Sequence, residues 1–178
     1  MKVAGLIGWH NSGKTTLLVA IVSELAARGY RVSTIKHAHH EFDVDTPGKD
    51  SWRHREAGAT EVMVGSAKRW VLMHELRGDT EPDLASLLSR MSEVDLVIVE
   101  GFKNADHEKI EVYRAGLEDP PLAHTASNVV AIATDIDIAN LKPGIIRLDI
   151  NAPETIADFM EHHWALTGSS FRSATESA

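Results

Sequence analysis

Short apolar runs alternate with amphipathic segments along this chain. The run at residues 3–7 has the length of a strand, and its lack of polar alternation is typical of a strand buried on both faces. A stripe of apolar residues at helical spacing follows it, formed by Leu18, Ile21, Val22 and Leu25. Because residues 32–35 then resume strand character, the pattern predicts two parallel strands joined by a right-handed helical crossover.

The same patterns predict the elements of the remaining chain. Further strands are predicted over residues 61–64, 69–74, 95–100, 109–113, 129–133 and 145–148, and helices over residues 50–57, 83–91 and 153–164. The four residues between the first two of these strands suit a hairpin, which we expect to form an antiparallel edge of the sheet. Strands that alternate with helices indicate a three-layer α/β fold with a mostly parallel sheet.

Composition limits the number of domains and the kinds of partner. A chain of 178 residues with 43% hydrophobic content predicts one compact domain, which we place at residues 1–166, with a disordered Ser/Thr-rich tail over 167–178. The net charge of -8 argues against a broad grip on nucleic acid or anionic lipid. There is no cysteine and no long apolar stretch, so we expect a cytoplasmic protein without a membrane span.

The loop after the first predicted strand carries the most specific motif. Residues 8–15 read Gly-Trp-His-Asn-Ser-Gly-Lys-Thr, which matches G-x-x-x-x-G-K-[S/T]. In this motif the backbone N–H groups and the following helix N-terminus face phosphate oxygens, Lys14 reaches the β- and γ-phosphates, and the Thr15 hydroxyl coordinates Mg²⁺. The predicted nucleotide-binding residues of this loop are Gly8, His10, Asn11, Ser12, Gly13, Lys14, Thr15 and Thr16.

Glu100 is the candidate for a second residue on the metal side. It ends the apolar run 96–99 and precedes Gly101. A phosphate-loop site places an acidic residue at the carboxyl end of a neighbouring buried strand, near the metal ion. The pattern therefore predicts that Glu100 contacts Mg²⁺, directly or through water; the alternative is a solvated residue at the end of a strand.

The polar segment 36–45 allows three interpretations. It contains a group of histidines, His37, His39 and His40. Imidazoles and carboxylates bind zinc, which gives one interpretation. In a parallel sheet, however, ligands bind beyond the carboxyl ends of strands, so the segment also suits a triphosphate, with Lys36 facing phosphate and Asp45 or Asp50 holding Mg²⁺ or a metal-bound water. The third interpretation is a solvated loop.

Several further stretches match a known family in their order along the chain. They are residues 35–40, 43–51, 57–59, 69–70, 99–103 and 148–151. Together with residues 8–16 they resemble the molybdopterin-guanine dinucleotide biosynthesis adaptor family, MobB. The resemblance implies a GTP-binding, usually homodimeric P-loop protein that assists the guanylyltransferase joining GMP to molybdenum-bound molybdopterin.

The resemblance also implies how the site residues divide their roles. Phosphate binding is assigned to residues 13–16 and metal-side acidity to Glu100. Asp135 follows the predicted strand 129–133 and is placed to accept hydrogen bonds from the guanine N1–H and exocyclic amine. The chain lacks the full Asn/Thr-Lys-x-Asp signature of many G proteins, so the preference for GTP over ATP rests on the resemblance.

Three functions remain open at this stage. The first is an adaptor with slow GTP hydrolysis, because the sequence supplies residues for phosphate and Mg²⁺ but no identifiable arginine finger or water-orienting residue. The second is a small-molecule kinase or ATP-dependent ligase that binds its acceptor in the polar loop. The third is a carrier that loads a metal on its histidine cluster.

Overall fold

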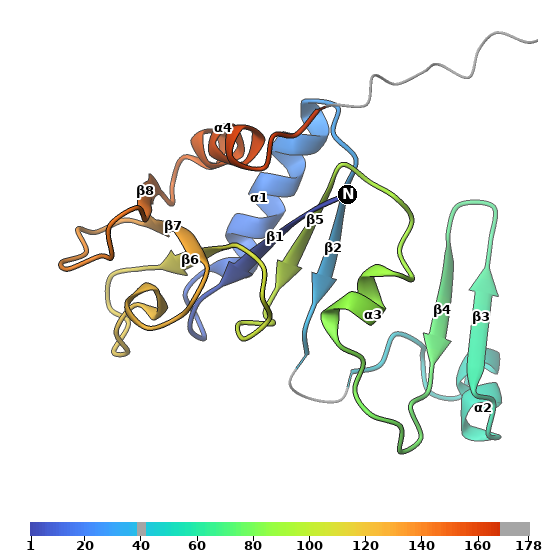
Figure 1. Cartoon of the computed structure of the whole chain (residues 1–178). Coiled ribbons are helices and arrows are strands. Elements are labelled where there is room, and N and C mark those ends of the chain that lie inside the picture. The colour runs from blue at the N-terminus through green and yellow to red at the C-terminus, as the bar shows by residue number, and fades with distance from the viewer. Residues whose placement is uncertain (39–41, 168–178) are drawn as a thin grey trace, which may run out of the picture. The chain divides into compact units, whose positions relative to one another are not determined.

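The protein is described here from a computed structural model, which covers residues 1–38 and 42–167 (Figure 1). These residues form two compact units, one within Met1–His37 and Ser92–Ala178 and the other within Ala38–Met91. Two compact units can belong to one domain, so the single domain over 1–166 stays a prediction. His39, His40 and all of the expected tail except Thr167 lie outside the described residues.

The first unit is built on a six-stranded sheet in which all neighbouring strands are parallel. The strand order is β2-β5-β1-β6-β7-β8. The strands are β1 (Lys2–Ile7), β2 (Val32–Lys36), β5 (Leu96–Glu100), β6 (Lys109–Tyr113), β7 (Val129–Thr134) and β8 (Ile146–Asp149). Because the strands are parallel, their carboxyl ends share one edge of the sheet.

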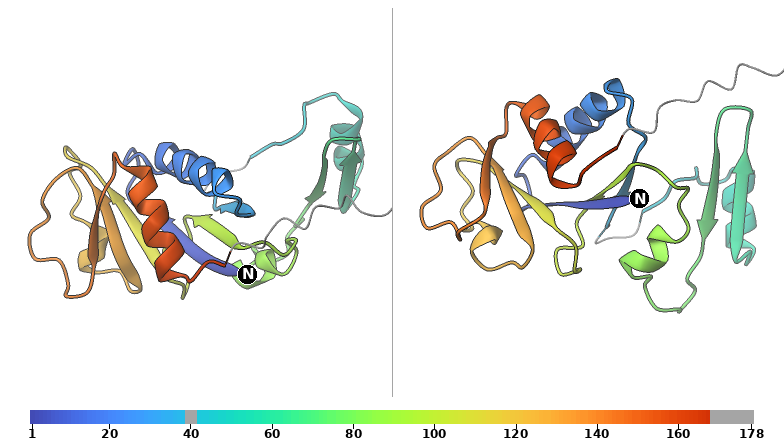
Figure 2. Two further views of the ribbon diagram at one scale, coloured as in Figure 1. Left: turned by 90° about the horizontal axis from the view of Figure 1, so that it is seen from above. Right: turned by 45° about the horizontal axis from the view of Figure 1, so that its top comes forward.

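Two helices cover one face of this sheet. Helix α1 (Lys14–Ala27) and helix α4 (Pro153–His163) lie side by side on it (Figure 2). Alternate strand residues, such as Leu6 and Val112, point into the core beneath these helices, and their neighbours Ile7 and Tyr113 join a second apolar cluster on the opposite face. This second cluster also receives side chains from the 3-10 turn η1 (Leu122–His124) and the loops around it.

The second unit contains short elements. They are α2 (Asp50–Glu56), β3 (Glu61–Gly65), β4 (Trp70–His74) and α3 (Leu84–Leu88). Strands β3 and β4 pair antiparallel, as predicted, but they form a two-stranded sheet of their own, so their expected place at the edge of the main sheet was wrong. Two apolar runs around a short loop indicate that the two strands pair with each other. They do not indicate whether the hairpin joins another sheet.

The prediction of an α/β fold with a mostly parallel sheet and an antiparallel hairpin is confirmed. Most element ends agree within one or two residues. The helix predicted over 83–91 ends earlier, at Leu88, although its start is as expected. Asp83 caps it, because its Oδ1 accepts a hydrogen bond from the Ser86 N–H at 2.8 Å.

Candidate functional site

Most of the predicted site residues gather at the carboxyl edge of the six-stranded sheet. The loop 8–13 joins the central strand β1 to α1. The register places Lys36 beside Glu100 on one side of β1, and on the other side it places Thr134, the residue before Asp135, beside Asp149. In such sheets the ligand usually binds in a crevice at this edge, at the point beside the first strand where the strand order reverses.

The backbone of the loop depends on glycine at position 8. Gly8 has φ +152°, and a Cβ atom there would lie 2.4 Å from the carbonyl oxygen of Val112. This oxygen belongs to the neighbouring strand β6 and cannot move away without disturbing the sheet. The loop therefore passes too close to β6 for any side chain at this position.

Replacing Gly8 with alanine tests this packing. We expect Gly8→Ala to lower the free energy of unfolding by more than about 3 kcal/mol, because backbone strain of roughly 1–3 kcal/mol is added to a steric clash. Gly29→Ala is the matched control, since Gly29 has φ +89° but no atom of the described residues within 4 Å of its Cβ position. Urea denaturation of both variants provides the measurement, and equal losses would show that the clash with Val112 contributes nothing.

Lys14 opens α1 and folds back over the loop. Its Nζ donates hydrogen bonds to the carbonyl oxygens of Gly8, at 2.9 Å, and Trp9, at 2.7 Å. Partial burial lowers the pKa of Lys14; the Glu100 carboxylate opposes this shift, and the Lys36 ammonium adds to it. An anion at the loop would favour the charged form of this half-buried amine.

Ser12 adds a polar group inside the same loop. The residue is fully buried, and its Oγ has no hydrogen-bond partner among the described residues. A buried hydroxyl without a partner carries an energetic cost that a ligand oxygen would relieve. The glycine-lined loop, the Lys14 amine and this hydroxyl together fit a bound phosphate group.

Glu100 lies at the centre of the predicted metal side. Its side chain is only 10% exposed, and its Oε1 accepts a hydrogen bond from the Thr15 hydroxyl at 3.3 Å. Lys36 Nζ lies 3.7 Å from the same oxygen. The structure thus brings together the hydroxyl and the carboxylate that the sequence predicted on the metal side, and oxygen ligands of these types suit Mg²⁺.

The turn after β5 closes this side of the site. Phe102 stacks on His37 with ring centroids 4.4 Å apart, and Lys103 Nζ lies 5.8 Å from the centroid of the Trp9 ring. His37 thus packs beside the turn, and His39 and His40, on which the zinc interpretation depends, lie outside the described residues. Within residues 1–38 and 42–167 no group of three or more His, Asp or Glu side chains is arranged to hold a metal ion by itself.

Asp45 belongs to the second unit. Its Oδ1 accepts a hydrogen bond from Arg55 Nη2 at 3.0 Å, and Asp43 shares the same nitrogen at 2.8 Å. The Asp45 side chain is nearly buried. This arrangement gives Asp45 a local partner within its own unit, and its metal-binding role stays a prediction.

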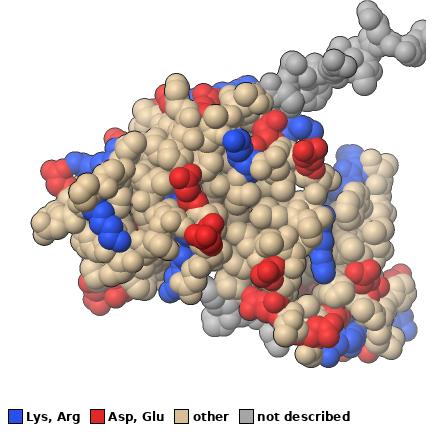
Figure 3. Space-filling view, in the orientation of Figure 1, with Lys and Arg blue, Asp and Glu red and all other residues tan. Residues whose placement is uncertain are grey.

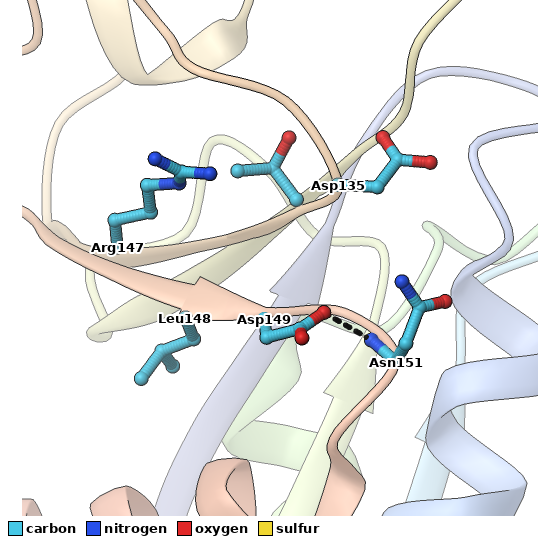
Figure 4. Close-up of a pocket in the computed structure, with 6 residues that line it drawn as sticks. Asp135, Arg147, Leu148, Asp149 and Asn151 are labelled. Carbon is cyan, nitrogen blue, oxygen red and sulfur yellow. Dashed lines mark hydrogen bonds between the residues drawn. The ribbon is translucent and has the colours of Figure 1, made fainter.

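A pocket of about 450 Å³ opens at the ends of β7 and β8 (Figure 4). It is lined by Thr134, Asp135, Arg147, Leu148, Asp149 and Asn151. Asp135 is held by the end of β6, because its Oδ1 accepts a hydrogen bond from the Ala115 N–H at 2.9 Å and its Oδ2 lies 3.8 Å from Arg114 Nη1. The Asn151 N–H donates to Asp149 Oδ1 at 2.8 Å, which fixes the turn after β8.

Sequence reasoning missed two residues of this region. Arg114 directly follows β6, and Asn151 follows β8 by two residues. Arg114 obeys the rule that selected Glu100, namely a polar residue at the carboxyl end of a predicted strand, and applying the rule to every strand would have found it. Asn151 lies three residues beyond the strand predicted over 145–148, so this rule does not select it.

Comparison with known proteins shows the family of this chain. The family model described as molybdopterin guanine dinucleotide synthesis protein B matches residues 3–135. The chain belongs to this family. It is 45% identical over 155 residues to the molybdopterin-guanine dinucleotide biosynthesis adapter protein of Escherichia coli, covering 85% of this chain and 87% of the relative. It is 41% identical over 167 residues to the adapter protein of Haemophilus influenzae, covering 92% of each.

Solved structures agree with this assignment. A crystal structure of molybdopterin-guanine biosynthesis protein B, 26% identical, superposes with a TM-score of 0.71 and covers 90% of this chain and 99% of that one. The structure of Bacillus subtilis MobB, 22% identical, shares the fold with a TM-score of 0.69, over 94% of this chain and 99% of that one. The predicted family and its role as an adaptor in molybdopterin-guanine dinucleotide biosynthesis are confirmed.

The surface and the helices add two observations. On the face that Figure 3 shows, Lys and Arg side chains are interspersed with Asp and Glu side chains. Within residues 1–38 and 42–167, no helix combines the length and apolar character needed to cross a bilayer.

Proposed function

We propose that this adaptor binds GTP together with Mg²⁺ in the cytoplasm and assists the guanylyltransferase that forms the dinucleotide cofactor. The observation that carries the proposal is the loop 8–16 beside Glu100. Its glycine-lined backbone, the Lys14 amine and the buried Ser12 hydroxyl fit phosphate oxygens. The remaining predicted contacts, His10, Asn11, Thr15 and Thr16, lie in the same loop and the first turn of α1.

Mg²⁺ would be held between the phosphates, the Thr15 hydroxyl and Glu100. When bound, the ion supplies positive charge to the phosphate oxygens. Thr15 and Glu100 already meet at 3.3 Å, so the protein provides two oxygen groups at one position. Lys36, 3.7 Å from Glu100, would face the same phosphates.

The pocket at β7 and β8 is the proposed base site. Guanine presents N1–H and an exocyclic amine as donors, and the Asp135 carboxylate offers two acceptor oxygens. The Asn151 side-chain amide lines the same pocket and offers both donor and acceptor groups (Figure 4). Adenine has no N1–H and would leave the carboxylate without that partner, which supports the assignment of GTP rather than ATP.

Isothermal titration calorimetry of GTP, ATP and GDP, with and without Mg²⁺, tests this proposal. We expect GTP to bind at least about tenfold more tightly than ATP, because a polar site left without its partner loses about 1–3 kcal/mol. We also expect Mg²⁺ to strengthen GTP binding. Equal affinities for GTP and ATP would contradict the base site, and a preference for ATP would favour the kinase or ligase alternative.

A reconstituted assay tests the role as an adaptor. Adding this protein to purified guanylyltransferase, molybdopterin cofactor and limiting GTP should raise the yield of dinucleotide cofactor. The sequence alone identifies neither an arginine finger nor a water-orienting residue, so we expect GTP turnover without the partner to be slow. An unchanged yield at limiting GTP would contradict the adaptor role.

The exposed apolar face of the hairpin supports a homodimer. Met63, Leu72 and Trp70 lie on one face of β3 and β4 and are 65%, 42% and 67% exposed. Exposed apolar side chains gathered on one face of a separate two-stranded sheet are typical of a protein interface. A second copy of the chain can cover this face with the same side chains.

Replacing the opposed pair in Met63→Glu/Leu72→Glu should weaken the dimer. Burying two carboxylates at an apolar contact is unfavourable, so we expect the dimer dissociation constant to rise at least about tenfold. Val19→Glu, at an exposed apolar position of α1, is the control. Sedimentation equilibrium measures the constant, and the same dimer affinity in the double variant and the wild type would contradict this interface.

A further inference from the structure

Arg114 is a cation at the sheet edge to which the proposed function assigns no role. It follows Tyr113, the last residue of β6, and therefore stands between the loop after β1 and the loop after β7 in the strand order. Its side chain is 37% exposed, so part of it is covered by protein and part remains accessible to a ligand.

On one side, Arg114 lies against the phosphate loop. A Cβ atom at Gly13 would be 2.9 Å from Arg114 Nε and 3.8 Å from its Cζ. The guanidinium therefore occupies the space that a side chain at Gly13 would fill. Gly13 is the residue before Lys14, so this contact reaches the part of the loop that starts α1.

On the other side, Arg114 lies beside Asp135. Its Nη1 is 3.8 Å from Asp135 Oδ2, and the N–H of the next residue, Ala115, donates to Oδ1 at 2.9 Å. The end of β6 thus approaches both oxygens of this carboxylate. Each carboxylate oxygen has two lone pairs, and the Ala115 N–H takes one of these four, so each oxygen of Asp135 can still accept a hydrogen bond from a ligand in the pocket.

We propose that Arg114 is a positioning residue for base recognition, which spans the phosphate loop and Asp135 and orients that carboxylate toward the guanine donors. This inference rests on the proposed GTP function. A guanidinium suits the role because its N–H groups lie in one plane and can match a carboxylate, whereas an ammonium acts as a point charge. At 3.8 Å the contact with Asp135 is an ion pair without a hydrogen bond. Arg114 acts through Asp135, and the guanine hydrogen bonds are made by the carboxylate.

Comparing GTP with inosine triphosphate isolates this role. Inosine triphosphate keeps the phosphates, the ribose and N1–H but lacks the exocyclic amine. In the wild type we expect GTP to bind at least about tenfold more tightly than inosine triphosphate, because inosine triphosphate lacks one hydrogen bond to a charged group. In Arg114→Ala that ratio should fall close to one, mainly through weaker GTP binding, and Arg114→Lys should recover only part of it. Calorimetry with Mg²⁺ measures both affinities.

Arg31→Ala is the matched control. Arg31 Nε also lies 3.8 Å from an aspartate oxygen, that of Asp95, but this pair precedes β2 and β5 at the opposite edge of the sheet. The control should keep the wild-type ratio of affinities. Thermal denaturation of each variant verifies that it is folded before its affinities are compared.

The possible results separate this inference from the proposal on which it rests. A wild type that binds GTP and inosine triphosphate equally contradicts the base site itself, and the role of Arg114 falls with it. A wild-type preference that persists in Arg114→Ala overturns the role of Arg114 alone. An equal loss of affinity for both nucleotides also overturns it, because such a loss indicates a contact with the phosphates.

A double-mutant cycle gives a second test. Asp135→Ala should remove the preference for GTP, and adding Arg114→Ala to it should leave the ratio unchanged, because residues that act as one unit are not additive. If each single variant lowered the ratio of the two affinities, and the double variant lowered it by the product of the two factors, Arg114 would not act through Asp135.

Discussion

Lys14→Ala should abolish measurable GTP binding while the protein keeps its fold. In the proposed site the amine bridges the terminal phosphates, and each charge-assisted hydrogen bond contributes about 1.5–3 kcal/mol, so we expect the dissociation constant to rise at least about a hundredfold. The fold should persist because, among the described residues, the hydrogen bonds of Lys14 Nζ go to the carbonyl oxygens of Gly8 and Trp9 within its own loop. Calorimetry and a thermal melt provide the two measurements.

The pKa of Lys14 supports the expectation that the fold persists. Burial lowers that pKa, which means that the folded protein disfavours the charged amine relative to water. Removing the amine therefore removes a cost as well as two hydrogen bonds. Lys142→Ala is the control, because Lys142 is an exposed lysine that also donates to a backbone carbonyl, that of Ala126. GTP affinity within a few-fold of wild type in Lys14→Ala would refute the phosphate site.

The sequence predicted the edge of the sheet better than the contacts around it. Buried parallel strands appear as continuous apolar runs, so their ends are visible, and polar residues at those ends must meet at one edge. This reasoning placed Lys36 and Glu100 at the same edge, and the register shows that they lie side by side there. It requires only the direction of the strands, which follows from the crossover connections. The strand order was not predicted, and β5 lies between β1 and β2, although the strand over 32–35 was expected next to the first strand.

Lys109 shows what such reasoning does not reach. A lysine that opens a strand is expected in water, yet Lys109 is fully buried. Its Nζ donates to the carbonyl oxygens of Ala105 at 2.7 Å and His107 at 2.6 Å, so the preceding loop folds over it. Periodicity describes faces of elements, and it contains no information on which loop carbonyls converge on one side chain. The contact of Arg114 with Gly13 escaped prediction for the same reason.

Glu100→Gln should remove most of the effect of Mg²⁺ on GTP binding. The amide keeps the size of the side chain but loses the negative charge that a divalent cation requires. Loss of a carboxylate that acts on a metal directly or through water typically weakens metal affinity about 10- to 100-fold. We therefore expect GTP affinities with and without Mg²⁺ to become nearly equal in this variant, whereas we expect the wild type to bind GTP more tightly with Mg²⁺.

The comparison with and without the ion separates a metal role from a structural one. Glu100 also accepts a hydrogen bond from Thr15 and lies beside Lys36, so a change in loop geometry would weaken GTP binding equally under both conditions. Glu100→Asp keeps the charge and should recover part of the Mg²⁺ effect. Glu154→Gln, at an exposed position of α4, should leave it unchanged. A full Mg²⁺ effect in Glu100→Gln would exclude this carboxylate from the metal site and leave the Thr15 hydroxyl as the protein ligand at this edge.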